Sequence, residues 1–313
     1  MKRHQEIYRQ LNLSNSIPIY LQSEWLDIVC VDGMKWDIVF SYDNQNNIQG
    51  YWTYVFKKQL FWNKITMPSF TPYMGPKLIY PQNLNEYERI SFENKVLKDL
   101  MDKLPSFAEI KFKWSRDYTN WLAFYWNKFR QQTSYTYLIQ DTSDTNFLFN
   151  QFKKSIQRQI RKASESIKIR ETDQVKGVMQ MLQLSLGTSS KHLMNEEILQ
   201  KIHLFAHSKN QSCILEAVDA NGKVIGAIYL IWDQQEMLYL YGGYDDQVND
   251  SGAMPLLFWT ALQKAHEMQL SFNFEGSMLP GVERFFRSYG AQLTPVFTIE
   301  KKSFPYKYLD VLR

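Results

Sequence analysis

Cysteine, long apolar runs and a strong net charge are all scarce or absent in this sequence of 313 residues. Its two cysteines, Cys30 and Cys213, have no spacing typical of a disulfide or a zinc site, which favours a reducing compartment. No run approaches about 18 apolar residues, and the first residues lack an apolar core of signal-peptide length. We therefore expect a cytoplasmic protein with no transmembrane segment. The net charge of +4 neither requires nor excludes a nucleic-acid partner.

The remaining composition is that of an ordinary globular protein. Hydrophobic residues make up 44% and charged residues 22%, which argues against a disordered chain. Aromatic residues are frequent at 15%, and we expect most of them in the core, although such rings also line binding grooves. The length suggests about two domains at roughly 150 residues each.

The two halves of the sequence repeat one order of elements. In the first half, strands at 36–43, 48–58 and 60–68 and a proline-rich loop precede a helix at 86–103, a strand at 107–114, a helix at 118–132 and a strand at 134–140. In the second half, a basic helix (150–166), helices near 173–186 and 195–208 and three strands between 212 and 245 precede a helix at 252–269, a strand at 270–276, a helix at 282–290 and a strand at 294–302. This order predicts two α/β (α+β) domains, 1–145 and 146–313, each a mixed, mostly antiparallel sheet flanked by helices.

The basic segment at 153–170 contains seven lysines or arginines and a single acid, Glu165. Apolar residues recur within it at near-helical spacing, so we predict one packed face and one cationic face. Such a face is either simply solvated or a polyanion contact that releases counterions on binding. The residues predicted to bind phosphate are Lys154, Arg158, Arg161 and Lys162.

The stretch "NFEGSMLPGVERFFRSYGAQ" (273–292) contains a loop with a glycine at each end. The loop lacks the Lys-Ser/Thr pair of a nucleotide-binding P-loop, so we interpret it as a strand-to-helix turn, with Pro280 near the start of the helix and Gly290 at its end. Glu275 ends the preceding strand, a frequent position for active-site groups in α/β proteins. It is a candidate catalytic base; alternatively, it caps the helix.

Tyrosines mark two further candidate binding segments. In "LYLYGGYD", Tyr239, Tyr241 and Tyr244 are expected to point one way along a strand. Tyr239 and Tyr241 are candidate substrate contacts, with core packing as the alternative. Tyr73 in "TPYMGP" is expected to reach a groove between the domains, and Lys191 is a further candidate substrate contact.

Two histidines are spaced for a metal but stand without a partner in the sequence. His203 and His207 lie four residues apart on a predicted helix, an arrangement that can hold a metal ion. Because no third ligand stands nearby in the sequence, we expect an ordinary helix face there and no metal. Neither cysteine is placed for a thiol nucleophile.

The order of elements resembles the GNAT N-acyltransferase fold, and two such units in tandem resemble the FemABX family of aminoacyl-tRNA-dependent peptidyltransferases. The resemblance is carried by "KKSIQRQIRKASESIKI", "LYLYGGYDD", "FNFEG" and "GVERFFRSYGA". It implies transfer of an amino acid from a charged tRNA to an amine, usually of a cell-wall peptide precursor. The implied partners are charged tRNA and a cell-wall or lipid-linked acceptor, with peripheral membrane association through that acceptor.

Residue by residue, the resemblance implies several roles. Phe286 stands where many GNAT acetyltransferases have a general-acid tyrosine, and it would instead shape the acyl pocket, while Arg287 would contact a phosphate or an oxyanion. Tyr241 matches a tyrosine that contacts the acceptor. The pyrophosphate loop of acetyl-CoA-using members is altered here to "NDSGAM", so aminoacyl-tRNA is expected as co-substrate, with no separate cofactor. Asp27 replaces a lysine that some members use for a nucleotide-sugar diphosphate.

Two other functions stay open. The first is a GNAT-type N-acyltransferase that uses acyl-CoA or an acyl carrier protein on a lipid or surface-polysaccharide precursor. The second is a catalytically silent GNAT-fold binding module.

Overall fold

The computed structural model describes residues 2–14, 17–59, 62–186, 195–245, 247–248 and 252–303. Within these ranges the chain divides into two compact units. Unit 1 comprises Met1–Asn15, Tyr20–Ser134 and Pro295–Arg313, and unit 2 comprises Ser16–Ile19 and Tyr135–Thr294. Among the described helices, none is long and apolar enough to cross a membrane.

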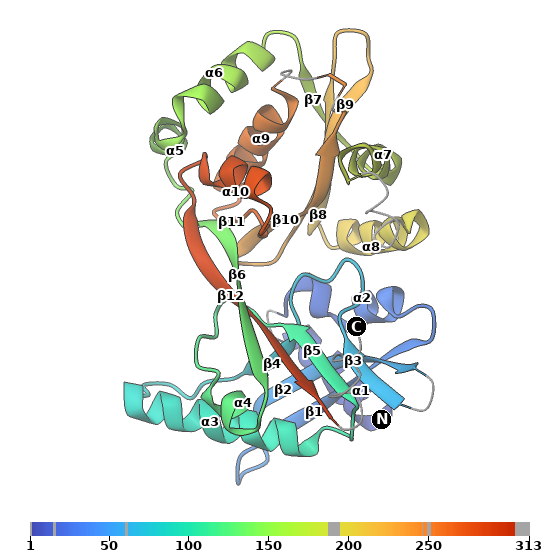
Figure 1. Ribbon diagram of the computed structural model, residues 1–313, viewed down its shortest axis with the longest axis vertical. Coiled ribbons are helices and arrows are strands. Elements are labelled where there is room, and N and C mark those ends of the chain that lie inside the picture. Colours follow the sequence, from blue (N-terminus) through green and yellow to red (C-terminus); the bar gives the residue numbers. More distant parts are fainter. Residues whose placement is uncertain are drawn as a thin grey trace, which may run out of the picture. The chain divides into compact units, whose positions relative to one another are not determined.

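Unit 1 contains a sheet in the order β1-β2-β3-β5-β12, with β4 paired to β2 (Figure 1). Strands β3 and β5 pair in parallel, whereas β1–β2, β2–β3, β2–β4 and β5–β12 pair antiparallel. The strands are β1 Met34–Tyr42, β2 Ile48–Gln59, β3 Trp62–Thr66, β4 Gly75–Leu78, β5 Glu109–Lys113 and β12 Gln292–Lys302. The helices are α1 Lys2–Ser14, α2 Ser23–Val29, α3 Glu86–Lys103 and α4 Leu122–Trp126, and a 3-10 turn, Ile19–Leu21, precedes α2.

Unit 2 has the strand order β6-β11-β10-β9-β8-β7, in which β10 and β11 pair in parallel and the other neighbours pair antiparallel. Helices α5, α6, α9 and α10 lie on one side of this sheet, and α7 and α8 lie on the other (Figure 1). The strands are β6 Arg130–Ile139, β7 Lys168–Thr172, β8 Ser212–Val218, β9 Val224–Trp232, β10 Glu236–Tyr244 and β11 Ser271–Asn273. The helices are α5 Thr145–Gln151, α6 Lys154–Ala163, α7 Val175–Leu186, α8 Glu196–Ser208, α9 Ala253–Glu267 and α10 Pro280–Arg287.

The last strand of each sheet comes from the other half of the chain. Strand β6, from the first half, pairs with β11 through Ile139 and Leu138. Strand β12, from the end of the chain, pairs with β5 from Thr298 to Lys302. The predicted mixed, mostly antiparallel sheets flanked by helices are confirmed. The two units, however, are not two contiguous segments divided between residues 145 and 146, because each contains chain from both halves of the sequence.

Four elements differ from those expected from the sequence. Helix α1 was not anticipated, and the proline-rich loop contains β4, which pairs with β2. The helix expected at 118–132 is only the short α4, because Lys128 adopts a positive φ and the chain then enters β6. The helix expected at 150–166 is interrupted at Phe152–Lys153.

The interruption at Phe152–Lys153 has a tertiary cause. The Phe152 ring is buried and lies 5.1 Å from the ring of Tyr289. The Lys153 N–H donates to the carbonyl of Ser288 instead of to a helical carbonyl, and the Gln157 amide donates to the carbonyl of Phe152. Contacts with the end of α10 therefore replace the helical hydrogen bonds of α5.

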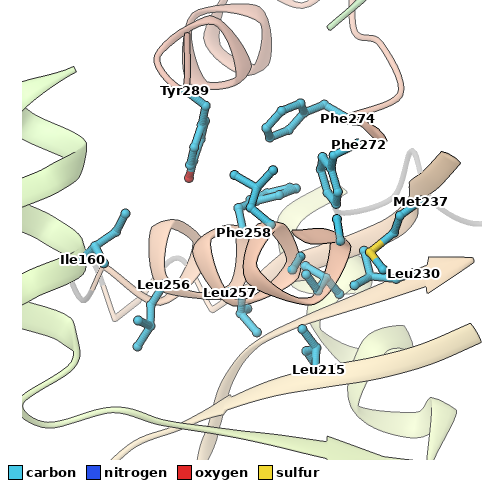
Figure 2. Packing of buried hydrophobic residues seen from close by; sticks show 14 of the residues in the cluster. Ile160, Leu215, Leu230, Met237, Leu256, Leu257, Phe258, Phe272, Phe274 and Tyr289 are labelled. Carbon is cyan, nitrogen blue, oxygen red and sulfur yellow. The ribbon is translucent and has the colours of Figure 1, made fainter. Parts of the chain in front are cut away.

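An aromatic cluster fills the core of unit 2 beneath α9. Phe258 of α9 faces Phe272, Phe274 and Tyr289 (Figure 2), with ring centroids 5.3 Å from Phe274 and 5.7 Å from Tyr289. All four rings are buried. Each such side chain contributes on the order of 1.5–3 kcal/mol by leaving water. This packing holds α10 and the end of β11 in place.

Candidate functional site

The candidate site is built around an irregularity in β10. The antiparallel register with β9 pairs Tyr239 with Leu230 and Tyr241 with Tyr229, so Leu240 is an extra residue on β10. Such a bulge leaves one residue unpaired and often re-aims side chains next to functional sites. It lies just after the residues of β10 that pair with the short parallel strand β11, which end at Leu238.

The bulge overturns the expectation that the three tyrosines point one way. Leu230 and Tyr229 are neighbours on β9 and therefore face opposite sides of the sheet, as do their partners Tyr239 and Tyr241. Tyr239 lies on the α9 side, where its ring contacts Phe258 at 4.9 Å. Tyr241 faces the same side of the sheet as Gly243, two residues later on the strand. A Cβ added to Gly243 would lie 2.3 Å from the backbone carbonyl of Met181 on α7. Tyr241 thus belongs to the α7 side.

A tight turn follows β11 and holds Glu275. The buried Asn273 side chain accepts from Thr136 Oγ1 at 2.7 Å and from the Glu275 N–H at 2.9 Å. Glu275 adopts a φ of 53°, and its Oε2 accepts from the Gly276 N–H at 2.9 Å. A Cβ on Gly276 would lie 1.8 Å from the carbonyl of Tyr135. The glycine is therefore required by close backbone packing, as in a strand-to-helix turn, and not by a phosphate.

Glu275, Tyr239 and Phe286 meet at this turn. Burial raises the pKa of Tyr239, and the neighbouring Tyr241 and Glu275 raise it further. The phenol therefore stays protonated and can donate a hydrogen bond at any working pH. The Phe286 ring lies 6.2 Å from that of Tyr239 and 5.4 Å from that of Phe274.

Helix α10 carries the other predicted catalytic residues. It begins with Pro280 and ends before Gly290, which has a φ of 71°, as the sequence predicts. Phe286 is buried in the aromatic cluster, whereas the Arg287 side chain is 64% exposed. Arg287 Nε lies 3.0 Å from Glu283 Oε1, one turn earlier on the helix.

The hydroxyl of Tyr137 on β6 completes this group by donating to the same oxygen of Glu283. Burial, and then the hydrogen bond and charge of Glu283, raise the pKa of Tyr137 to about 12. The phenol is thus a permanent donor. Its hydrogen bond orients Glu283, which in turn holds the Arg287 guanidinium at the end of α10.

The predicted cationic face is present on α6. Its apolar residues Ile156, Ile160 and Ala163 are buried. The predicted phosphate contacts Lys154, Arg158, Arg161 and Lys162 are all exposed. Within the described ranges, no carboxylate forms an ion pair with any of them. The Arg161 guanidinium lies 5.4 Å from the Phe149 ring centroid, beside a groove of about 560 Å³ between α5, α6 and α9.

The start of α9 is poorly suited to hold a CoA pyrophosphate. Gly252 caps the helix with a φ of 72°, and its added Cβ would lie 2.9 Å from the carbonyl of Gln159 on α6. Ala253 is 2% exposed, and Pro255 has no N–H to offer an anion. Helix N-termini bind anions through free N–H groups. At the start of α9, Pro255 lowers the number of these groups, and contact with α6 partly covers them. Asn249, the altered position of the pyrophosphate loop, lies outside the described residues.

The other predicted residues fall elsewhere. Tyr73 lies in unit 1, where it is 2% exposed and packs against Tyr20, with the Lys113 ammonium 4.9 Å from its ring centroid. Lys191 lies outside the described residues. Asp27 accepts from Trp36 Nε1 at 2.7 Å and from Arg9 at 2.9 Å, so it has a structural role in unit 1.

Sequence reasoning missed Asn273, Glu283 and Tyr137. The asparagine between two phenylalanines of a buried strand was a usable signal, because a buried amide needs partners. Glu283 lies four residues before Arg287, the spacing of a helical ion pair. Nothing in the sequence indicated Tyr137, because it reaches α10 only through the pairing of β6 with β11.

A family model described as the acetyltransferase (GNAT) domain matches residues 150–287. No protein of curated function matches the sequence. Among solved structures, FemX has a TM-score of 0.67 at 10% identity, over 100% of this chain and 98% of FemX.

Two further structures share the fold. The C-terminal domain of a putative lysylphosphatidylglycerol synthetase from Agrobacterium fabrum has a TM-score of 0.54 at 10% identity, over 99% of this chain and 95% of that one. A tandem GNAT protein from the clavulanic acid biosynthesis pathway has a TM-score of 0.52 at 9% identity, over 90% and 94%. Residues 150–287 therefore match the acetyltransferase (GNAT) domain, within a chain that has the tandem GNAT fold and is similar to FemX.

Proposed function

We propose that this acyltransferase moves an aminoacyl group from a charged tRNA to an amine of a cell-wall peptide or a related acceptor. The observation that carries the proposal is the cationic face of α6, which has no ion-pair partner among the residues that the structure describes, beside a start of α9 that is poorly suited to pyrophosphate. A polyanionic donor fits the first feature, and a CoA thioester does not fit the second.

The reaction requires little from the protein beyond alignment. The acceptor amine attacks the ester carbonyl, an amide bond forms, and the bond to the ribose oxygen breaks. The proton lost by the amine ends on that oxygen. Because the ester is already activated, holding the amine against the carbonyl and stabilising the oxyanion supply most of the rate.

Glu275 and Tyr239 are assigned to the reacting groups. Glu275 accepts the proton of the attacking amine, and its turn is held by Asn273 and Gly276. Tyr239, kept protonated by burial, donates a hydrogen bond to the developing oxyanion. Phe286 has no proton to give, so its role is to form the apolar wall beside Tyr239.

Arg287 and Tyr241 are assigned to the substrates. Arg287 is exposed, permanently charged and oriented by Glu283, so it fits a phosphate of the donor better than a proton shuttle. Tyr241 lies on the opposite, α7 side of the sheet and is assigned to the acceptor.

The similar structures support the same reaction class. One is FemX and another is described as a putative lysylphosphatidylglycerol synthetase, a name that implies an aminoacylated lipid product. A lipid-linked amine acceptor is therefore included within the proposal, and binding to it would bring the chain to a membrane surface.

Donor retention tests the proposal. Labelled aminoacyl-tRNA and acetyl-CoA are incubated separately with the full chain, and bound label and acyl loss are measured at 50 and 200 mM salt. We expect tRNA to be retained, with weaker retention at the higher salt because phosphate contacts release counterions. Retention of acetyl-CoA without tRNA would instead establish the acyl-CoA enzyme, and tRNA retention without turnover would establish a silent binding module.

A triple variant locates the contact. Replacing Arg158, Arg161 and Lys162 with alanine removes three cations, which we expect to lower tRNA affinity by about 10–100-fold and to flatten its salt dependence. The matched control replaces three exposed lysines of unit 1, Lys57, Lys95 and Lys98. Equal tRNA affinity in the two triple variants would contradict a role for α6.

A further inference from the structure

Three side chains of unit 2 that are distant in the sequence converge on one point beside α8. Asp173 follows β7, and His203 and His207 lie one turn apart on α8. Asp173 Oδ1 lies 3.6 Å from His203 Nε2 and 3.5 Å from His207 Nδ1, and the three ligand atoms lie within 4.8 Å of one another. The third ligand that the two histidines lack in the sequence is therefore supplied by the fold.

His203 is unusual because it is wholly buried and its Nε2 has no hydrogen-bond partner among the described residues. Its other ring nitrogen, Nδ1, lies 3.4 Å from the hydroxyl of the buried Ser212. With the proton on Nδ1 and directed to that hydroxyl, Nε2 presents a lone pair toward the Asp173 carboxylate. Two electron-rich atoms then face each other, and a cation between them removes the repulsion.

The surroundings of His203 suit a metal ligand, because the ring is wholly buried and its Nδ1 lies 3.4 Å from the Ser212 hydroxyl. The Ser212 hydroxyl would serve as the outer partner that commonly fixes the tautomer of a metal-bound histidine.

Two of the three ligand-to-ligand distances also fit a tetrahedral ion. Zinc bonds to histidine nitrogen and carboxylate oxygen at about 2.0–2.2 Å, which places neighbouring ligands roughly 3.3–3.5 Å apart. The two measured nitrogen–oxygen separations, 3.6 and 3.5 Å, are near this edge length and beyond good hydrogen bonds. Two imidazoles and one carboxylate form the protein ligand set of some catalytic zinc sites, and the same set also binds non-haem iron(II).

We propose that Asp173, His203 and His207 form a zinc site with a fourth position open to water. The exposure of Asp173 (64%) and His207 (49%) leaves solvent access on one side, and the buried His203 closes the other. The ion would tie the turn between β7 and α7 to α8 and so stabilise the α7–α8 side of unit 2, the side on which Tyr241 lies.

Zinc binding to the full chain tests the site. The protein is stripped with a chelator, and zinc affinity is measured at pH 7.5 by competition with a chromophoric chelator; cobalt absorption then reports the geometry. We expect one zinc per chain, a tetrahedral cobalt spectrum and a higher melting temperature with zinc. His207→Ala and Asp173→Ala should each weaken zinc by at least about 100-fold, since losing only an outer partner costs about 10–100-fold.

The controls separate ligand loss from misfolding. Both replaced side chains are largely exposed, so both variants should keep the wild-type circular dichroism spectrum without zinc. Lys201→Ala, on the same helix and outside the cluster, should bind zinc as the wild type does. Absence of bound zinc in the wild type, or equal zinc affinity in His207→Ala, Asp173→Ala and Lys201→Ala, would overturn the proposal.

Discussion

The residues that follow the parallel strand differ between the two units. In unit 1, β5 is followed by Trp114 and Ser115; the Trp114 ring stacks on Tyr118 at 4.8 Å and its Nε1 donates to the carbonyl of Pro76. In unit 2, the corresponding strand β11 is followed by Phe274 and then by Glu275, which has a positive φ. The same sheet pattern is thus followed by a packed corner with ordinary φ in one unit and by a carboxylate residue at positive φ in the other.

This difference concerns the base assigned in the proposed function. A non-glycine residue at positive φ persists only where its surroundings hold it. Glu275 is held by Asn273. At the unit 1 corner, the Ser115 hydroxyl donates to Asp117. The proposed function therefore assigns the reacting groups to unit 2.

Glu275→Gln is the variant in which we expect the largest difference between the two units. Glutamine can still accept from the Gly276 N–H but cannot take a proton, so we expect aminoacyl transfer to slow by about 10²–10⁴-fold. The rate is measured as acyl loss from labelled tRNA in the presence of acceptor. Ser115→Ala, at the corresponding position of unit 1, should leave the rate unchanged. Comparable rates in the two variants would remove the distinction between the corners.

Gly276→Ala tests the turn itself. The added methyl group would lie 1.8 Å from the Tyr135 carbonyl, so we expect a loss of about 3 kcal/mol in the free energy of unfolding in urea. Gly281→Ala is the matched control, because nothing lies within 4 Å of its added Cβ. That variant should be unchanged or slightly more stable, since alanine favours helix. A small effect of Gly276→Ala would show that the turn yields easily.

The smallest effect concerns ion pairs and pH. The hydrogen bond from Lys223 lowers the pKa of Asp245 in unit 2, and the hydrogen bond from Arg89 lowers the pKa of Glu86 in unit 1. A depressed folded pKa contributes stability above the unfolded value, and this contribution is lost as pH falls through the folded value. Melting temperatures between pH 6 and about 2.5 should therefore fall, and less so in Lys223→Gln and in Glu86→Gln. An identical pH profile in the wild type and Lys223→Gln would show that the pair in unit 2 contributes nothing.

Much of the local structure could be read from the sequence. The apolar spacing around Ile156 and Ile160 predicted the buried face of α6, and the bounds predicted for α3 match those observed, beginning after the Asn85 cap with its Glu88 partner. Pro280 and Gly290 correctly marked the turn and the limits of α10. These features depend on residues within one or two turns of each other.

Other features depended on partners far along the chain. The interruption at Phe152–Lys153 depends on Ser288, and the direction of Tyr241 depends on a bulge opposite β9. The sequence of one strand cannot reveal a bulge, because a bulge is defined by how that strand pairs with its neighbour. The same sequence is compatible with pairing in either register. The prediction that Tyr239 and Tyr241 share one face was wrong for this reason, whereas Tyr244, three residues after Tyr241, faces away from Tyr241 by simple alternation.

By itself, the sequence determined the periodic elements, the cationic face of α6 and the α/β order that resembles a GNAT fold, because each follows from local spacing and composition. Only the tertiary structure decided that the two units exchange their last strands, that Thr136 and Tyr135 pack against Asn273 and Gly276, and that Asp173 joins His203 and His207. Such pairings form between residues tens to hundreds of positions apart. Their choice rests on which surfaces pack together, a property that no short window of sequence contains.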